Sequence, residues 1–267
     1  MRVETLIATM GKQDYALLDR MNVQTDAVVI HQTDCFSCEE KWRNDRRVLW
    51  YSFAEFGVGR SRNTALDRAR EEIVLFADDD LRYDDGYEEK IVRFYQKHPN
   101  ADVVLFQFRG RERAGQVRDK QPKIRRMGKK SLAKYGAVNV SARLSSIRRA
   151  NVHFHLLFGG GAEFGCGEDT IFLQDCFKKG LVILASEECL GEITKDRPST
   201  WFQGYNDKYF FDKGVLFYTV SPILSQGIAL YHAIKHRRNY PQYGWRRGYN
   251  QIKRGIQEAR LRDRKRL

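Results

Sequence analysis

The chain has 267 residues, of which 42% are hydrophobic and 30% charged, and its formal net charge at pH 7 is +13. This length and composition describe a soluble globular protein with one large core, or with a core and a small appendage. Its start leads directly into a strand-like run rather than a cleavable apolar segment, so we expect no signal peptide.

The positive charge is concentrated in two segments. Residues 109–149 hold 14 Lys and Arg against two acidic residues, and residues 235–267 hold 12 against two. The rest of the chain is therefore net negative, which excludes a uniformly basic protein. Basic segments of this kind bind nucleic acid, anionic lipid or phosphorylated ligands.

The first half of the chain alternates apolar runs with amphipathic stretches. The expected strands are residues 3–10, 26–31, 48–53, 73–76 and 101–108, and the expected helices begin near Asp14, near Asn63 and at Tyr87. Ser61 or Asn63 is the predicted N-cap of the second helix. This order predicts an α/β domain with a largely parallel sheet.

Three carboxylates follow the buried strand 73–76. Asp78, Asp79 and Asp80 come at its C-terminal end, which is where an open α/β sheet binds its ligands. Like charges so close together favour a hard divalent cation with oxygen ligands. The alternative is a helix N-terminus, where the macrodipole stabilises acidic residues.

Two glycine-rich loops precede predicted helices. Gly57 and Gly59 lead into a helix that begins with Arg60, Arg62 and Asn63, an arrangement that suits a phosphate but equally fits an ordinary loop. The second loop, residues 159–167, ends at Glu168 and Asp169. Those carboxylates either stabilise a helix start or present a general base to a ligand.

With these motifs in place, residues 3–214 resemble the family 2 glycosyltransferases, which have the GT-A fold. The resemblance rests on Gly59-x-x-Arg62-Asn63, on the DxD-type cluster Asp78–Asp80 and on the Glu168-Asp169 pair, in this order. It implies a Rossmann-like mixed, largely parallel sheet with a helical C-terminal extension. Thr9 and Asp34 match the polar residue after the first strand and the carboxylate that contacts the nucleotide base.

The resemblance implies a site and a reaction. Thr9, Asp34, Arg62, Asn63, Asp78 and Asp79 would bind the donor nucleotide, and Asp80 with Asp78 would hold Mn²⁺ or Mg²⁺. Asp169 would be the general base of an inverting transfer from a nucleotide-sugar, expected to be UDP-linked. Glu168 and Trp201 would contact the acceptor, a glycan or a lipid-linked glycan of cell-surface polysaccharide synthesis.

The chain also departs from the family pattern. The family's first strand usually ends in Pro-Thr-Tyr-Asn, whereas this chain has Ala8-Thr9-Met10-Gly11. The Gln-x-x-Arg-Trp motif of processive synthases is absent, and Ser199-Thr200-Trp201-Phe202 stands in its region. In this region the chain resembles the non-processive bacterial enzymes of the family.

The expected boundaries divide the chain into a catalytic domain and an extension. Residues 1–108 would form the nucleotide half of the catalytic domain, 109–213 its acceptor half, and 214–267 the extension. Residues 214–231 carry no charge, and the basic tail is interleaved with aromatic residues. We expect packed or interfacial helices in a cytoplasmic protein that binds the anionic inner face of a membrane. The alternatives are a single span and a solvated, disordered tail.

Two other functions remain open at this stage. A nucleotidyltransferase also uses metal-binding aspartates on an α/β sheet, but Gly11-Lys12-Gln13 is a poor version of its glycine- and basic-rich turn. A basic RNA-binding protein would use residues 109–149 and the tail, but it leaves the acidic motifs unexplained. We therefore expect no nucleic-acid partner.

Overall fold

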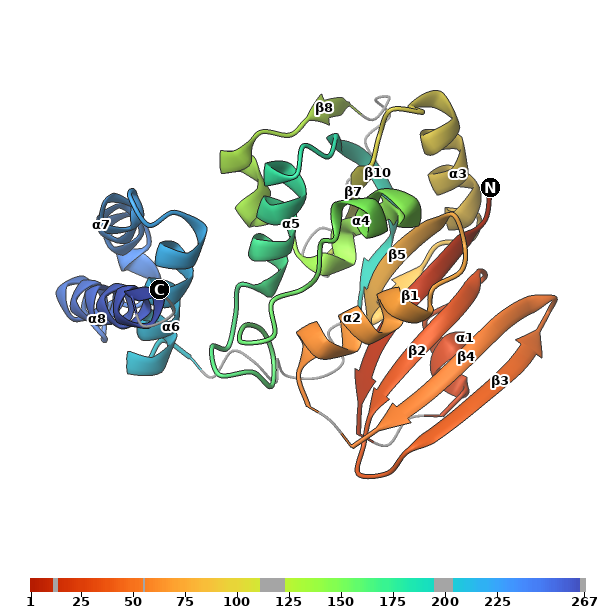
Figure 1. The fold of residues 1–267 in the computed structure, drawn as a ribbon, viewed down its shortest axis with the longest axis horizontal. Coiled ribbons are helices and arrows are strands. Elements are labelled where there is room, and N and C mark those ends of the chain that lie inside the picture. The colour runs from red at the N-terminus through yellow and green to blue at the C-terminus, as the bar shows by residue number, and fades with distance from the viewer. Residues whose placement is uncertain (12–13, 55, 111–122, 195–203, 265–267) are drawn as a thin grey trace.

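The computed structural model describes residues 1–11, 14–54, 56–110, 123–194 and 204–264 (Figure 1). The first half contains β1 (Val3–Met10), α1 (Ala16–Arg20), β2 (Asp26–Gln32), β3 (Ser37–Arg43), β4 (Arg46–Phe53), α2 (Val58–Arg68), β5 (Ile73–Asp78), β6 (Leu81–Tyr83), α3 (Tyr87–Lys97) and β7 (Val103–Arg109). The second half contains β8 (Ile124–Arg126), β9 (Val140–Arg143), α4 (Leu144–Ala150), α5 (Glu168–Lys178), β10 (Ile183–Ile193), α6 (Asp207–Val220), α7 (Ser225–Lys235) and α8 (Trp245–Arg264).

Ten strands of the described chain form one mixed sheet. Its order is β3-β4-β2-β1-β5-β9-β7-β10-β6, and β8 pairs with β10. The block β4-β2-β1-β5 is parallel throughout, so the C-terminal ends of these four strands lie at the same edge. β9 runs antiparallel between β5 and β7 and separates this block from the rest of the sheet.

Each face of the sheet carries its own core, because successive side chains of a strand point to opposite faces. On β5, Val74 and Phe76 pack with α2, α4 and α5, whereas Ile73 and Leu75 pack with α1 and α3. These residues are fully buried, which explains why the predicted strand 73–76 is uniformly apolar. The predicted α/β class is confirmed, and the predicted parallel pairing is present in the block β4-β2-β1-β5.

Two details differ from the sequence-based expectation. The strands β3, β6, β8 and β10 were not predicted; β3 is an exposed, highly charged hairpin strand without the apolar alternation that identifies a strand. Ser61 and Asn63 do not cap α2, which begins at Val58 after Gly57, so that prediction is wrong. Of the predicted basic excursion, residues 111–122 lie outside the described chain.

Helices α6, α7 and α8 form a group on the side of the molecule opposite β3 (Figure 1). α6 and α8 cross at two glycines: a Cβ on Gly214 would lie 2.0 Å from the Ile252 carbonyl oxygen, and one on Gly255 would lie 2.0 Å from that of Phe211. Only glycine permits this approach. The expected boundary at 213/214 falls inside α6, and the tail as far as residue 264 forms a packed helix rather than a disordered segment.

Candidate functional site

The C-terminal ends of β1 and β5 bring the first predicted residues together. The Thr9 hydroxyl donates a hydrogen bond to Asp79 Oδ2 at 2.7 Å, so the side chains that end the two neighbouring strands are in contact. The Asp80 carbonyl accepts hydrogen bonds from the backbone N–H and hydroxyl of Thr194, at 2.7 and 3.0 Å. The Asp80 residue itself is exposed.

Arg62 is the centre of the candidate site. Its Nη2 donates to Asp78 Oδ1 at 2.8 Å, and its Nη1 donates to Glu168 Oε1 at 3.0 Å and to Asp169 Oδ1 at 2.9 Å. The Arg62 side chain is 4% exposed. One buried guanidinium therefore joins the acidic end of β5 to the acidic start of α5, which are 90 residues apart in sequence.

The position of Arg62 follows from the way α2 is anchored. The Val58 N–H donates to the Gly160 carbonyl at 2.8 Å, which ties the start of α2 to the second glycine loop. One turn later the Asn63 side chain binds both the N–H and the carbonyl of Phe154, at 2.7 and 2.9 Å. The Phe154 ring lies 5.3 Å from the Arg62 guanidinium.

Asp169 is held in a partly dehydrated position. Its side chain is 26% exposed, and a Cβ on Gly136 would lie 3.4 Å from its Oδ2. Burial raises the pKa of the Asp169 carboxyl to about 7; Arg62 opposes this shift, and the Glu168 carboxylate adds to it. A carboxyl group with this pKa exchanges its proton near neutral pH, as a general base must.

Glu168 lies deeper than Asp169. The residue is 8% exposed, and a Cβ on Gly159 would lie 2.6 Å from its Cδ, so the loop can pass over Glu168 only with glycine there. Gly159 also has φ +98°, a conformation that favours glycine. In the structure Glu168 holds Arg62, and its predicted contact with the acceptor stays a prediction.

The remaining predicted residues fall in different places. Asp34 lies in the exposed segment after β2 and accepts a hydrogen bond from the Thr33 hydroxyl at 3.0 Å. Trp201 lies outside the described residues. The sequence did not single out Gln32, whose side-chain oxygen accepts from the Gly57 N–H at 3.0 Å. Its place at the end of a predicted strand was the signal that could have identified it.

Two cavities of the described chain lie elsewhere in the fold. One of about 220 Å³ is enclosed by the 155–164 segment, α6 and α8, and its walls include Phe158, Phe164 and Tyr218. Another of about 290 Å³ lies at the N-terminal ends of β2 and β4. Neither contains a predicted site residue, so we define the candidate site by the hydrogen bonds around Arg62.

The comparisons with known proteins concern the family and the fold. The sequence profile of the family described as "Glycosyl transferase family 2" matches residues 36–153. This segment contains Arg62, Asn63 and the Asp78–Asp80 cluster. No curated protein sequence matches the chain.

Solved structures of glycosyltransferases share the fold. S. aureus TarS in complex with UDP-GlcNAc matches with a TM-score of 0.61 and 17% identity, over 91% of this chain and 73% of that one. Mannosyltransferase PcManGT from Pyrobaculum calidifontis, in complex with GDP-Man and Mn²⁺, matches with a TM-score of 0.52 and 13% identity, over 97% and 75%. At these identities the likeness establishes the GT-A fold. Together with the profile match over residues 36–153, it agrees with the resemblance to the family 2 glycosyltransferases found in the sequence.

Proposed function

We propose that this chain catalyses an inverting, metal-dependent transfer of a sugar from a UDP-linked donor to a hydroxyl group of a glycan or lipid-linked glycan. We place it in cell-surface polysaccharide synthesis, in the cytoplasm or on the inner face of a membrane. The observation that carries the proposal is the Arg62 guanidinium, which binds Asp78 and Asp169 at once. This contact puts Asp78, the carboxylate proposed to bind the donor, and Asp169, the proposed base, on either side of the fixed Arg62 guanidinium.

Asp169 is the proposed general base. In-line attack needs a base that removes the acceptor proton as the hydroxyl oxygen approaches the sugar carbon opposite the leaving diphosphate. The pKa of Asp169, raised to about 7, makes its carboxylate a stronger base than a solvated one. Arg62 fixes Oδ1, so a positioned side chain, not a mobile one, would accept the proton.

Donor binding is assigned to the strand ends. Asp78 would contact the ribose, Thr9 would hold Asp79 in place, and Asp34 would contact the base. Arg62 and Asn63 were predicted to touch the donor directly; their contacts with carboxylates and with the Phe154 backbone support a positioning role next to it.

The two proposed metal ligands fit a hard divalent cation. Asp80 and Asp78 would supply the oxygen ligands that Mg²⁺ and Mn²⁺ prefer. The described residues contain no group of three His, Cys, Asp or Glu side chains that could hold a metal. With two carboxylates proposed as ligands, donor phosphates and water would complete the coordination of the cation. When bound, the cation stabilises the charge of the leaving diphosphate.

The test is a thermal-shift panel of UDP- and GDP-sugars with Mn²⁺ and with a chelator. At a hundredfold excess over the dissociation constant, the donor should stabilise the protein by about 2.7 kcal/mol, a melting shift of roughly 5–10 °C. Asp80→Ala should lose the Mn²⁺-dependent part of the shift, whereas Asp85→Asn, an exposed acid between β6 and α3, should keep it. Equal shifts with and without Mn²⁺ in the wild type would contradict the metal assignment, and no shift with any nucleotide-sugar would contradict the function.

A further inference from the structure

Helix α7 turns apolar side chains toward water. Five large apolar residues of α7 and of the turn before it are exposed: Ile223 (94%), Leu224 (59%), Leu230 (42%), Tyr231 (61%) and Ile234 (44%). We call these five residues the α7 apolar face. Buried side chains of α7 include Ser225, Ala229 and Ala233, which are four residues apart and form a stripe toward α6 and α8. The usual pattern of a surface helix is therefore reversed, with the small residues inside and the large apolar ones outside.

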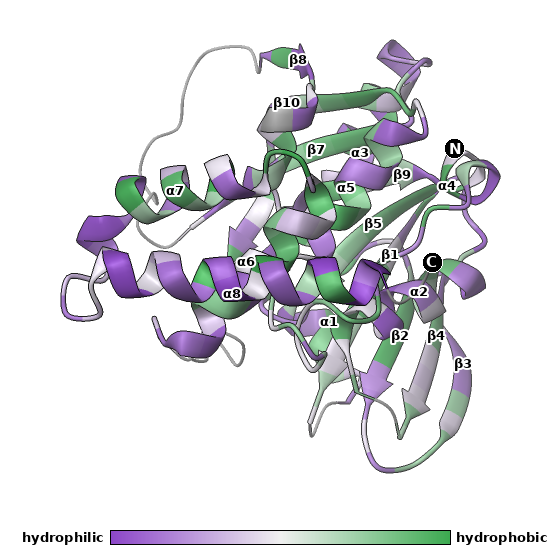
Figure 2. Cartoon of the chain, turned by 60° about the vertical axis from the view of Figure 1, so that its left-hand side comes forward, coloured by the Kyte–Doolittle hydropathy of each residue, from purple (hydrophilic) through white to green (hydrophobic). Residues whose placement is uncertain are grey.

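The surroundings of this face are basic. Residues 213–257 contain eight Lys and Arg and no Asp or Glu. Arg237 and Arg238 follow α7 directly and are exposed, and the Lys235 ammonium lies 5.1 Å from the centre of the Tyr231 ring. Trp245, 36% exposed, lies under the Arg246 guanidinium at 5.4 Å. Figure 2 shows α7, with both hydrophobic and hydrophilic segments, beside the largely hydrophilic α8.

We propose that the α7 apolar face lies in the surface layer of an anionic lipid bilayer, with its basic neighbours on the lipid phosphates. A helix with exposed apolar side chains on one face and a basic surround binds membranes in this way. Residues 213–257 contribute no carboxylate that an anionic surface would repel, and the exposed Asp207 next to them is paired with Arg247. This deepens the membrane location given with the proposed function, but its chemistry is independent of donor and acceptor.

The helix would lie along the surface and not across the bilayer. α7 has 11 residues, so it is about 16 Å long, roughly half the thickness of the hydrocarbon core. Among the described residues, no helix is both long and apolar enough to cross a membrane. Binding through one short face is reversible, so salt and lipid charge should control it.

Flotation of the full chain with vesicles tests the proposal. The wild type should float with equimolar phosphatidylcholine and phosphatidylglycerol and remain at the bottom with phosphatidylcholine alone. Ile223→Glu/Ile234→Glu should weaken binding by about a hundredfold or more, because two apolar anchors become charged. Arg237→Gln/Arg238→Gln should weaken it by about fivefold for each charge removed.

Trp42→Glu is the matched control. Trp42 is 66% exposed and belongs to β3, which lies on the opposite side of the molecule from α7 (Figure 1), so this change should leave flotation unchanged. Circular dichroism and the melting temperature should show that every variant is folded. No flotation of the wild type, equal flotation with neutral vesicles, or an equal loss for Trp42→Glu would overturn the proposal. A wild-type dimer that becomes a monomer in Ile223→Glu/Ile234→Glu would overturn it in favour of an interface between copies.

Because flotation uses no nucleotide-sugar, its failure leaves the thermal-shift test of the proposed function untouched. The reverse also holds: a chain that binds no donor could still float.

Discussion

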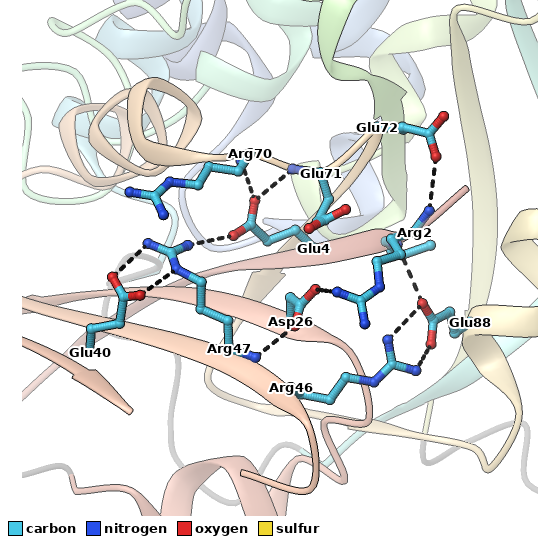
Figure 3. Close-up of polar contacts among 11 residues, drawn as sticks. Arg2, Glu4, Asp26, Glu40, Arg46, Arg47, Arg70, Glu71, Glu72 and Glu88 are labelled. Carbon is cyan, nitrogen blue, oxygen red and sulfur yellow. Dashed lines mark hydrogen bonds and ion pairs between the residues drawn. The ribbon is translucent and has the colours of Figure 1, made fainter. Parts of the chain in front are cut away.

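Two buried arginines lie at opposite edges of the same sheet, and each is surrounded by acids. At the N-terminal edge, the Arg47 Nη1 donates to Glu4 at 3.3 Å, its guanidinium contacts Glu40, and its backbone N–H donates to Asp26 at 2.7 Å (Figure 3). At the C-terminal edge, Arg62 contacts Asp78, Glu168 and Asp169. Both guanidinium groups are more than nine-tenths buried.

The two clusters differ in what else binds their carboxylates. At the N-terminal edge, Glu4 also accepts the backbone N–H groups of Arg70 and Glu71, at 2.6 and 3.3 Å, and its side chain is 1% exposed. At the C-terminal edge, Asp169 shares Arg62 with two further carboxylates, and a quarter of its side chain is exposed. The Glu4 carboxylate is saturated, meaning that protein groups occupy its hydrogen-bonding positions, and it is inaccessible to solvent. The Asp169 carboxylate can reach a ligand.

The pKa values follow from the same difference, although burial raises both. At Glu4 the backbone hydrogen bonds and Arg47 oppose the shift, and the side chain is closed off from solvent. At Asp169 burial is again the largest cause; Arg62 and a backbone hydrogen bond from Ala137 oppose the shift, but the neighbouring Glu168 and Asp78 add to it, and the pKa reaches about 7. A buried Arg–carboxylate cluster is therefore structural where its acids are saturated, and it suits catalysis where one guanidinium serves three acids beside solvent.

The largest expected effect comes from Asp169→Asn. Loss of the general base should lower the transfer rate by about 10²–10⁴-fold, while donor binding persists because the amide keeps the shape of the side chain and Asp78 keeps Arg62 in place. The measurement is the initial rate of sugar transfer beside calorimetry of donor binding. Asp175→Asn, an exposed acid on the same helix, is the control and should retain wild-type turnover. Near-normal turnover of Asp169→Asn would refute the base assignment.

The second prediction compares Arg62→Met with Arg47→Met. Each variant leaves buried carboxylates unpaired, so we expect each to lose about 3–5 kcal/mol of unfolding free energy in urea titrations. Only Arg62→Met should also lose transfer activity under conditions where both proteins remain folded, since only that cluster contains the proposed base. Equal loss of specific activity in the two folded variants would mean that Arg62 acts through stability alone.

The fold was largely predictable from sequence because apolar runs report burial directly. The segment 73–76 is buried on both faces, and its uniform Ile-Val-Leu-Phe run identified it. β3 was not predicted because an edge strand with charged residues needs only backbone partners. β10 was not predicted because it is partly exposed and irregularly paired. Gly214 and Gly255 gave no sequence signal, because a close helix crossing depends on what lies opposite each glycine.

The site was predictable as a set of residues but not as an arrangement. The motifs identified Arg62, Asp78, Glu168 and Asp169 separately, and strand order placed Asp78 at the correct edge of the sheet. The sequence could not show that one guanidinium holds three of these acids, because that depends on how α2 and α5 meet across 90 residues or more. For the same reason the sequence could not show that Asn63 binds the Phe154 backbone, which is a long-range contact; its predicted contact with the donor stays a prediction.

The smallest expected effect is the pH dependence of stability, which isolates Asp169 from the saturated cluster. The folded-state pKa of Asp169, about 7, lies above its ordinary value of 3.8. Between these values the folded protein binds the proton more tightly than the unfolded chain does, so this contribution to stability is full below pH 3.8 and is lost as pH rises through 7.

Asp169→Asn removes the ionisation. Its free energy of unfolding should therefore exceed that of the wild type at pH 8 by roughly 1–4 kcal/mol, which raises the melting temperature by several degrees, and the difference should shrink at pH 5. Calorimetric melting of both proteins across this range measures it, and Asp175→Asn, whose carboxylate lies at the surface, should show no such trend. A wild type that melts higher than Asp169→Asn at pH 8 would show that ionised Asp169 stabilises the fold as Glu4 does, and the contrast between the two clusters would fail.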